Sequence, residues 1–169
     1  EIEVIISDNG STDNTQQIIH NYVKNYKEIS FVLFKHPKNT GYFGNFAKCK
    51  KLANGKFFWL LSDNDYVRKG ILKKVIQLLM QNPNLGSIHF SYNTSKFFLT
   101  KNTVVKKDLS NDELFQKAGI YPSLISSVIF RNIKDDEKDI FKRFSGNSFL
   151  GFAMYINALK YYSNNIIIY

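Results

Sequence analysis

Short apolar segments alternate with amphipathic ones along the first half of the chain, and this alternation constrains the fold most strongly. Buried strands are predicted by three short β-branched or aromatic runs: EIEVIIS (1–7), SFVLFKH (30–36) and KFFWLL (56–61). Helices are predicted after each of them, beginning near Asp13, near Asn45 and at Ile71. Strands that alternate with helices predict an α/β layered fold with a mostly parallel central sheet flanked by helices.

The second half of the sequence is predicted to be mixed. Strands are expected at 86–92 and 123–130, an extended arm or hairpin at 96–107, and helices at 111–119, 135–144 and 149–162. A length of 169 residues with 44% hydrophobic residues suits one domain with an ordinary core, and we find no internal repeat. We therefore treat residues 1–169 as a single domain.

Charge and cysteine usage limit the function classes. The formal net charge is +9, which suits an anionic partner such as a phosphorylated small molecule or a phospholipid surface. The lysines are scattered rather than gathered into a basic arm, so we do not expect a nucleic-acid partner. The single cysteine, Cys49, rules out an intrachain disulfide and fits a reducing cytoplasm. No apolar run approaches the length of a membrane span.

Two polar turns follow predicted strands and indicate where a ligand would bind. Asp8, Asn9 and Ser11 follow the first strand, and Asp63 and Asp65 follow the run FFWLL. In an open α/β sheet the ligand site lies outside the carboxyl ends of the strands, so neighbouring strands would place both turns on one crevice. Such a cluster of carboxylates requires a cation, and Mg²⁺ or Mn²⁺, which take oxygen ligands and share them with phosphates, fit best.

Each signal has an ordinary structural alternative when taken singly. Asp-Asn-Gly is a common turn sequence, and a D-x-D triplet arises by chance. An EF-hand at 63–70 is excluded because Val67 would have to act as a ligand and the glycine is misplaced. The three histidines have no ligand spacing, and neither a dinucleotide glycine motif nor a Walker lysine is present. The order of the motifs is therefore more informative than any one of them.

Two long segments together carry a family resemblance. EIEVIISDNGSTDNTQQII and then NTGYFGNFAKCKKLANGKFFWLLSDNDYV resemble family 2 glycosyltransferases of the GT-A fold, most closely the bacterial abequosyltransferase-like enzymes of surface polysaccharide synthesis. The resemblance implies a Rossmann-like GT-A fold. It also implies metal-dependent, inverting transfer of a sugar from a nucleotide-sugar donor to a saccharide or lipid-linked acceptor. PSLISSVIFRN (122–132) resembles a later strand of the same enzymes more weakly.

The resemblance implies roles for residues that match its motifs. Asp8 would contact the base or ribose, and Asn39, Gly41 and Asn45 would lie beside the nucleotide. The full set implied for the nucleotide-sugar is Asp8, Asn9, Ser11, Asn39, Gly41, Asn45 and Asp63. Asp63 and Asp65 would hold the Mn²⁺ or Mg²⁺ ion that bridges the diphosphate, and that ion would stabilise the charge on the leaving group.

The resemblance leaves the general base unassigned. Asn147 and Ser148 occupy positions where an acid is expected, and Asp108, Asp112 and Glu113 are candidates by charge alone. The predicted acidic face of the helix at 135–144, with Asp135, Asp136, Glu137 and Asp139, is expected to be solvated.

Family members also begin with a further strand and helix, so we expect a chain truncated at its N-terminus and, given the terminal run IIIY, at its C-terminus. Two functions stay open at this point. The first is a cytoplasmic glycosyltransferase with peripheral contact to an anionic membrane. The second is a catalytically inactive remnant that binds nucleotide or serves as an interaction domain.

Overall fold

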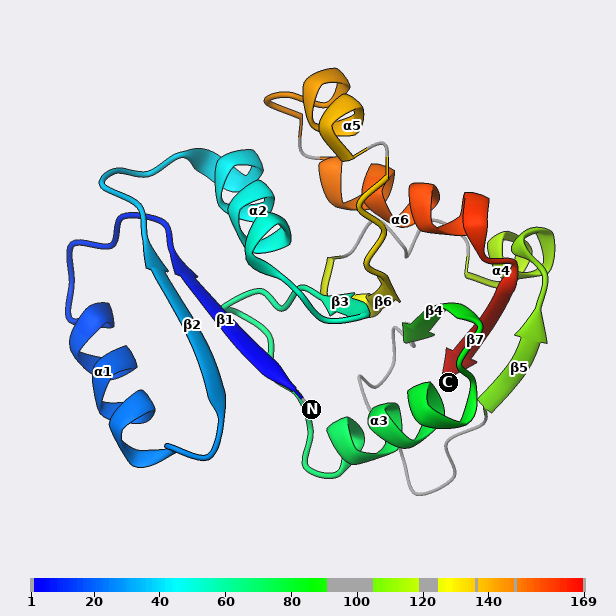
Figure 1. Ribbon diagram of the computed structural model, residues 1–169, viewed down its shortest axis with the longest axis horizontal. Coiled ribbons are helices and arrows are strands. Elements are labelled where there is room, and N and C mark those ends of the chain that lie inside the picture. Colours follow the sequence, from blue (N-terminus) through cyan, green and yellow to red (C-terminus); the bar gives the residue numbers. More distant parts are fainter. Residues whose placement is uncertain (1, 91–104, 119–124, 136, 148, 169) are drawn as a thin grey trace.

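The computed structural model describes residues 2–90, 105–118, 125–135, 137–147 and 149–168 (Figure 1). The strands in these ranges are β1 (Glu3–Asp8), β2 (Ser30–Lys35), β3 (Phe57–Trp59), β4 (Leu85–Phe90), β5 (Val105–Leu109), β6 (Val128–Arg131) and β7 (Asn164–Ile168). The helices are α1 (Thr15–Asn25), α2 (Gly41–Leu52), α3 (Ile71–Gln81), α4 (Asn111–Ala118), α5 (Glu137–Arg143) and α6 (Leu150–Tyr161), and a short 3₁₀ turn, η2 (Ile125–Ser127), precedes β6.

The strands form two sheets, and their pairing corrects the expectation of a mostly parallel sheet. β1 and β2 form a parallel two-stranded sheet, while the second sheet has the order β3-β6-β4-β7-β5. Within it only β4 and β7 are parallel, and β6 runs antiparallel to both β3 and β4. The sequence indicates a helical crossover between β3 and β4 through α3, but it does not show that β6 is inserted between them.

The predicted α/β layering is confirmed, because helices pack on both faces of the five-stranded sheet (Figure 1). On one face α6 packs Met154 and Tyr155 against Phe130 and Ile167. On the other face α3 packs Val75 and Leu78 of its apolar stripe against the sheet. Together they form a core cluster with Leu85, Ile88, Ile129, Ile166 and Ile168. Both faces of β4, β6 and β7 are thus removed from water, which explains why burial does not alternate along these strands.

Helix starts were predicted less well than helix bodies. α3 covers the predicted 71–81, whereas α2 begins at Gly41, four residues before the predicted start. α1 begins close to the predicted Asp13, with Asn14 as its N-cap. Asp13 and Gln16 have the spacing of a capping box but do not form one, because the Gln16 side chain binds Asp8 instead.

A capping box does occur at α4. The hydroxyl of Ser110 accepts from the backbone N–H of Glu113 at 3.3 Å. The carboxylate of Glu113 accepts from the backbone N–H of Ser110 at 3.0 Å. The sequence pattern S-x-x-E at 110–113 therefore marks the start of α4.

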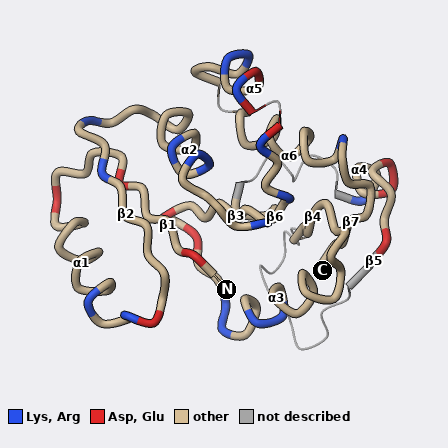
Figure 2. The backbone as a smooth tube through the Cα atoms, viewed as in Figure 1, with Lys and Arg blue, Asp and Glu red and all other residues tan. Residues whose placement is uncertain are grey.

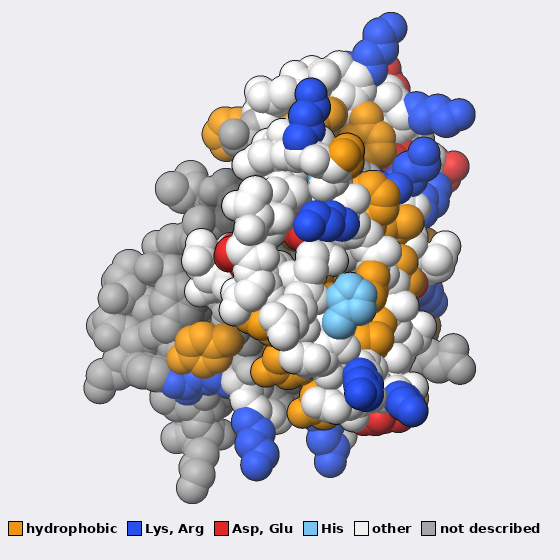
Figure 3. Space-filling model, turned by 90° about the vertical axis from the view of Figure 1, so that its left-hand side faces the viewer, with side chains coloured by type: hydrophobic (Ala, Val, Ile, Leu, Met, Phe, Trp, Pro, Cys, Tyr) orange, Lys and Arg blue, Asp and Glu red, His pale blue; other side chains and the backbone are white. Residues whose placement is uncertain are grey.

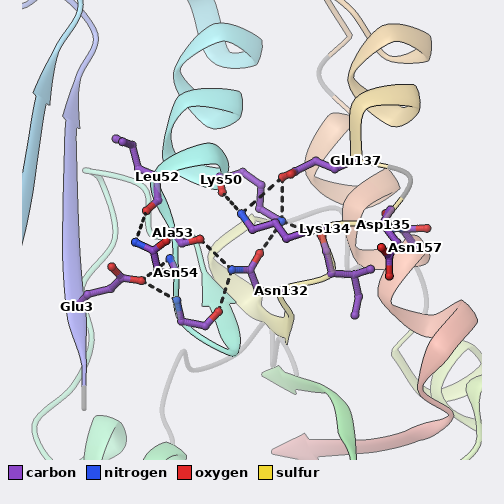
Figure 4. Close-up of polar contacts among 12 residues, drawn as sticks. Glu3, Lys50, Leu52, Ala53, Asn54, Asn132, Lys134, Asp135, Glu137 and Asn157 are labelled. Atoms are coloured by element: carbon purple, nitrogen blue, oxygen red, sulfur yellow. Dashed lines mark hydrogen bonds and ion pairs between the residues drawn. The ribbon is translucent and has the colours of Figure 1, made fainter.

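A buried lysine joins the end of α2 to the segment that connects β6 and α5 (Figure 4). The Lys50 side chain is 1% exposed, and its Nζ donates to Asn132 Oδ1 at 2.6 Å, Ile133 O at 3.1 Å and Glu137 Oε1 at 3.0 Å. All three ammonium protons therefore have acceptors. Burial lowers the pKa of Lys50, and the hydrogen bond and charge of Glu137 oppose this effect. Glu137, predicted on a solvated helix face, is in fact 14% exposed and paired.

Asn132 extends this contact to the turn before β3. Its Nδ2 donates to Ala53 O at 3.1 Å and to Gly55 O at 2.8 Å. The same turn is held from β1, because Glu3 Oε1 accepts from the backbone N–H groups of Asn54 at 2.6 Å and Gly55 at 2.7 Å. These bonds, rather than strand pairing, connect the two sheets around the end of α2 (Figure 4).

Buried His89 on β4 gives the protein a pH-dependent stability. His89 is 2% exposed, and its ring lies edge-on to the ring of Tyr155 with the two centroids 5.0 Å apart. Burial lowers the pKa of His89 to about 3. The unfolded chain binds a proton below about pH 6.5 while the folded chain does not, so stability falls as the pH drops from 7 toward 3. Because His89 takes up its proton only in the unfolded chain, we expect it to lower the free energy of unfolding by about 2 kcal/mol between pH 7 and pH 5.

Urea unfolding of the wild type and His89→Phe at both pH values measures this loss. The variant should lose correspondingly less stability on acidification, and His20→Gln, which changes an exposed histidine, should behave like the wild type. Equal losses in all three proteins would contradict the assignment to His89.

Candidate functional site

Asn9 joins the turn after β1 to the loop that begins α2. Its Nδ2 donates to Asn39 Oδ1 at 3.0 Å and to Gly41 O at 3.3 Å, and its Oδ1 accepts from the backbone N–H of Thr40 at 2.9 Å. Asn39 Oδ1 in turn accepts from the N–H of Gly41 at 2.7 Å. The first backbone donors of α2 are therefore satisfied by two asparagines, one of them distant in sequence, and this explains the early start of the helix.

Gly10 allows the two loops to lie in contact. Its φ of 81° is in the left-handed region, and a Cβ atom there would lie 2.7 Å from the carbonyl carbon of Lys38. Only glycine fits both the backbone angle and this close approach. The Asp-Asn-Gly sequence therefore forms a turn, which is its ordinary structural role. Its glycine also allows this turn to contact the loop at 38–41 in the candidate site.

Asp8, the residue implied for the base or ribose, is 5% exposed and already occupied. One carboxylate oxygen accepts from the Ser11 N–H at 2.8 Å, and the other accepts from Gln16 Nε2 at 2.5 Å, with Lys35 Nζ at 4.0 Å. Burial alone would raise its pKa, but these hydrogen bonds and the lysine outweigh it and hold the pKa of Asp8 below its usual value. As placed, Asp8 orders the turn, and Asn9 and Asn39 present polar groups nearer the surface.

Asn45 lies in α2, one turn beyond the loop that Asn9 binds. Its Oδ1 is buried without a hydrogen-bond partner among the described residues. No hydrogen bond joins its side chain to Asn9, Asn39 or Gly41 within the part of the chain that the structure describes. Hydrogen bonds therefore join Asn9, Asn39 and Gly41, and the Asn45 side chain, one turn along the same helix, takes no part in these bonds.

The turn after β3 carries two exposed carboxylates, Asp63 and Asp65. The backbone N–H of Asp65 donates to Ser62 O at 3.1 Å, and the Ser62 hydroxyl lies 3.4 Å from Asp63 Oδ1. Within the described ranges, no three His, Cys, Asp or Glu side chains gather closely enough to hold a metal ion. Two carboxylates with free oxygens do suit a Mg²⁺ or Mn²⁺ ion whose other ligands are phosphates and waters, which is how these ions are commonly bound.

The two halves of the candidate site are not hydrogen-bonded to one another. Among the described residues, no hydrogen bond or ion pair connects the 63–65 turn with the turn at 8–11 or the loop at 38–41. β1 and β3 belong to different sheets, so the expectation that neighbouring strands bring both turns to one crevice is not met by strand pairing.

Sequence reasoning missed the residues that hold these turns. Gln16, Thr40 and Ser62 were not selected, although each is a short-range polar neighbour of a selected residue. Ser126 was also missed, because its contacts are long-range: its hydroxyl accepts from the Ser62 N–H at 3.0 Å, and its carbonyl accepts from Trp59 Nε1 at 3.0 Å. Only the antiparallel insertion of β6 beside β3 brings it there.

Two of the acids considered as general bases have partners within the second half of the chain. Asp108 accepts from Asn164 Nδ2 at 3.2 Å and Glu113 caps α4, while Asp112 is exposed on the same helix. Asp139, on the helix face expected to be solvated, pairs with Arg143 at 2.8 Å. Ser148 and Asp136 lie outside the described residues. Figure 2 shows the lysines and arginines spread over helices and loops rather than in one stripe, as the sequence suggested.

The layered fold defines the structural class of this protein, which is the GT-A fold. S. aureus TarS (residues 1–349) superposes with a TM-score of 0.70 at 17% identity, over 98% of this chain and 48% of TarS. A mannosyltransferase from Pyrobaculum calidifontis, solved with GDP-Man and Mn²⁺, gives a TM-score of 0.51 at 14% identity, over 85% of this chain and 37% of the other.

The chain belongs to glycosyl transferase family 2, whose sequence model matches residues 1–146. The uncharacterized glycosyltransferase MG025 of Mycoplasma genitalium is 32% identical over 56% of this chain and 31% of its own length. Abequosyltransferase RfbV of Salmonella typhimurium is 35% identical over 43% of this chain and 21% of RfbV.

A third relative is a β-1,3-glucosyltransferase of Campylobacter jejuni named for GalNAc(5)-diNAcBac-PP-undecaprenol, which is 33% identical over 53% of this chain and 27% of its own length. The matched part thus spans about a third or less of these relatives. In the described part of the chain, each helix is too short or too polar to cross a bilayer.

Proposed function

We propose that this domain transfers a sugar from a nucleotide-sugar donor to a saccharide or lipid-linked acceptor in bacterial surface polysaccharide synthesis, with Mn²⁺ or Mg²⁺ and with inversion at the anomeric carbon. The observation that carries the proposal is the pair of exposed carboxylates, Asp63 and Asp65, on a turn at the end of β3 in a family 2 glycosyltransferase. The name of RfbV supports sugar transfer, and the name of the Campylobacter enzyme, which contains a saccharide on PP-undecaprenol, supports the acceptor class.

In the proposed reaction the acceptor hydroxyl attacks the anomeric carbon, and the bond from that carbon to the diphosphate oxygen breaks. Asp63 and Asp65 would hold the divalent ion, which when bound offsets the negative charge of the departing diphosphate. The amide groups of Asn9 and Asn39 would lie beside the base or ribose, on a wall kept in place by Gly10. The group that accepts the proton of the hydroxyl is left unassigned.

A cytoplasmic location with peripheral contact to an anionic membrane face belongs to this proposal, because a lipid-linked acceptor lies at such a surface. Figure 3 shows lysines and apolar side chains together on the face formed by α1 and β2. Ile18 is 48% exposed there, Tyr22 58% and Tyr26 45%. Co-sedimentation with phosphatidylglycerol vesicles at low salt tests this contact, and its absence would remove the membrane from the proposal.

Calorimetry with UDP, GDP, CDP and dTDP, each with and without Mn²⁺, tests the central claim. We expect heat of binding for at least one nucleotide, and we expect it to require the metal, because two surface carboxylates alone give a diphosphate no favourable contact. Binding that is equal with and without Mn²⁺ would contradict the assignment of Asp63 and Asp65. No binding of any nucleotide would favour the alternative of an inactive remnant.

A further inference from the structure

We infer that Ser126 is a positioning residue for the Asp63–Asp65 turn, an inference that rests on the proposed metal role of those two acids. Ser126 lies in η2, just before β6, and it contacts the segment after β3 at two points. Its carbonyl accepts from Trp59 Nε1 and its hydroxyl accepts from the backbone N–H of Ser62, both at 3.0 Å. One residue thus holds both ends of the short segment that leads into the acidic turn.

Ser62 carries this restraint forward to the acids. Its carbonyl accepts from the N–H of Asp65 at 3.1 Å, and its hydroxyl accepts from the N–H of Asn64 at 3.3 Å. The same hydroxyl lies 3.4 Å from Asp63 Oδ1, which is a weak hydrogen bond. The position of the Ser62 peptide, which Ser126 sets, therefore determines the direction of the whole turn.

The turn needs this support because the sheet ends before it. The β3–β6 ladder stops at the pair Trp59–Ile129, and α3 begins only at Ile71. Asp63 and Asp65 are exposed, and Tyr66 next to them is 79% exposed, so packing contributes little order. A metal ion gains affinity when its carboxylates are already held in place, because less conformational entropy is lost on binding.

A purely structural role for Ser126 predicts a different set of effects. In that case Ser126→Ala would lower the melting temperature, and Mn²⁺ binding would fall only as far as the folded protein is lost. A positioning role predicts that the Mn²⁺ concentration for half-saturation rises while the melting temperature changes little. The Ser126 hydroxyl is one hydrogen bond to an exposed turn, so its loss should be small for folding.

The test is a Mn²⁺ titration, followed by the electron paramagnetic resonance of free Mn²⁺, with UDP, GDP, CDP or dTDP present. We expect Ser126→Ala to raise the half-saturating Mn²⁺ concentration about fivefold, the effect of losing one hydrogen bond. Ser126→Thr keeps the hydroxyl and should stay within about twofold of the wild type. Ser62→Ala, which changes the turn itself, should weaken Mn²⁺ binding even if Ser126→Ala does not fold.

Three results would overturn the inference. They are wild-type Mn²⁺ half-saturation in a folded Ser126→Ala protein, equal weakening by Ser126→Ala and Ser126→Thr, and, where Ser126→Ala does not fold, an unchanged Ser62→Ala. Absence of Mn²⁺-dependent nucleotide binding in the wild type would overturn the proposed function together with this inference. The two failures are therefore distinguishable by the wild-type titration alone.

Discussion

The double variant Asp63→Ala/Asp65→Ala is expected to lose metal-dependent nucleotide binding by at least about 100-fold. Removing both carboxylates leaves the turn without an anionic ligand, and the neighbouring Ser62 and Asn64 cannot replace two charges. Both acids are exposed, so the unfolding free energy should stay within about 0.5 kcal/mol of the wild type. Calorimetry with Mn²⁺ and the four nucleoside diphosphates measures the first effect, and urea unfolding measures the second.

A matched control separates ligand binding from a general change of charge. Asp112→Ala/Asp135→Ala removes two other exposed carboxylates and changes the net charge by the same amount. This control should bind nucleotide and metal like the wild type. If the control loses as much affinity as the Asp63/Asp65 variant, the effect comes from the overall electrostatic field rather than from a metal site.

Lys50→Met is expected to lower the unfolding free energy by about 3–5 kcal/mol. The substitution keeps the length of the side chain but removes the ammonium, so the buried acceptors on Asn132, Ile133 and Glu137 lose their shared donor. The Glu137 carboxylate, 14% exposed, then keeps only the longer contact with Lys134 Nζ at 4.0 Å, and leaving a buried charge poorly compensated is more costly than the loss of the pair itself. Chemical unfolding followed by circular dichroism gives the change in unfolding free energy. The two proteins can be compared as two-state systems if this free energy depends on denaturant concentration with the same slope in both.

Two further variants test the cause of that loss. Lys51→Met, at the exposed neighbouring position, should change stability by no more than about 0.5 kcal/mol. Adding Glu137→Gln to Lys50→Met should restore part of the loss, because the uncompensated charge is then removed. A Lys50→Met protein as stable as Lys51→Met would show that this buried network contributes no net stability.

The fold could be predicted from the sequence where the signal is local. The apolar stripe of Ile71–Gln81 gave α3 correctly, and the alternation of strands and helices gave the layered class. β7 (Asn164–Ile168) was missed although its run of isoleucines is a local strand signal, and nothing local marks its place between β4 and β5. Strand order depends on contacts between distant segments, and local periodicity contains no information about them.

The sequence located the two turns of the candidate site but not the hydrogen-bond partners of their residues. The two turns at 8–11 and 63–65 were found by their position after apolar runs. Asp8 was selected for its charge, yet burial and the hydrogen bonds from Ser11 and Gln16 occupy it inside the turn. Asn9 and Ser126 obtain their importance from contacts that only the folded chain shows, and the roles of all these residues in donor binding remain predictions.

The place of β7 inside the sheet, between β4 and β5, has a consequence for how the protein is made. Ser87 on β4 donates to Asn165 on β7, a partner 78 positions further along the chain. While a ribosome is still translating the residues before β7, one edge of β4 is open and its apolar groups are without their cover. This sheet can therefore close only after β7 has been synthesised, and until then the open edge of β4 is a site at which chains can aggregate.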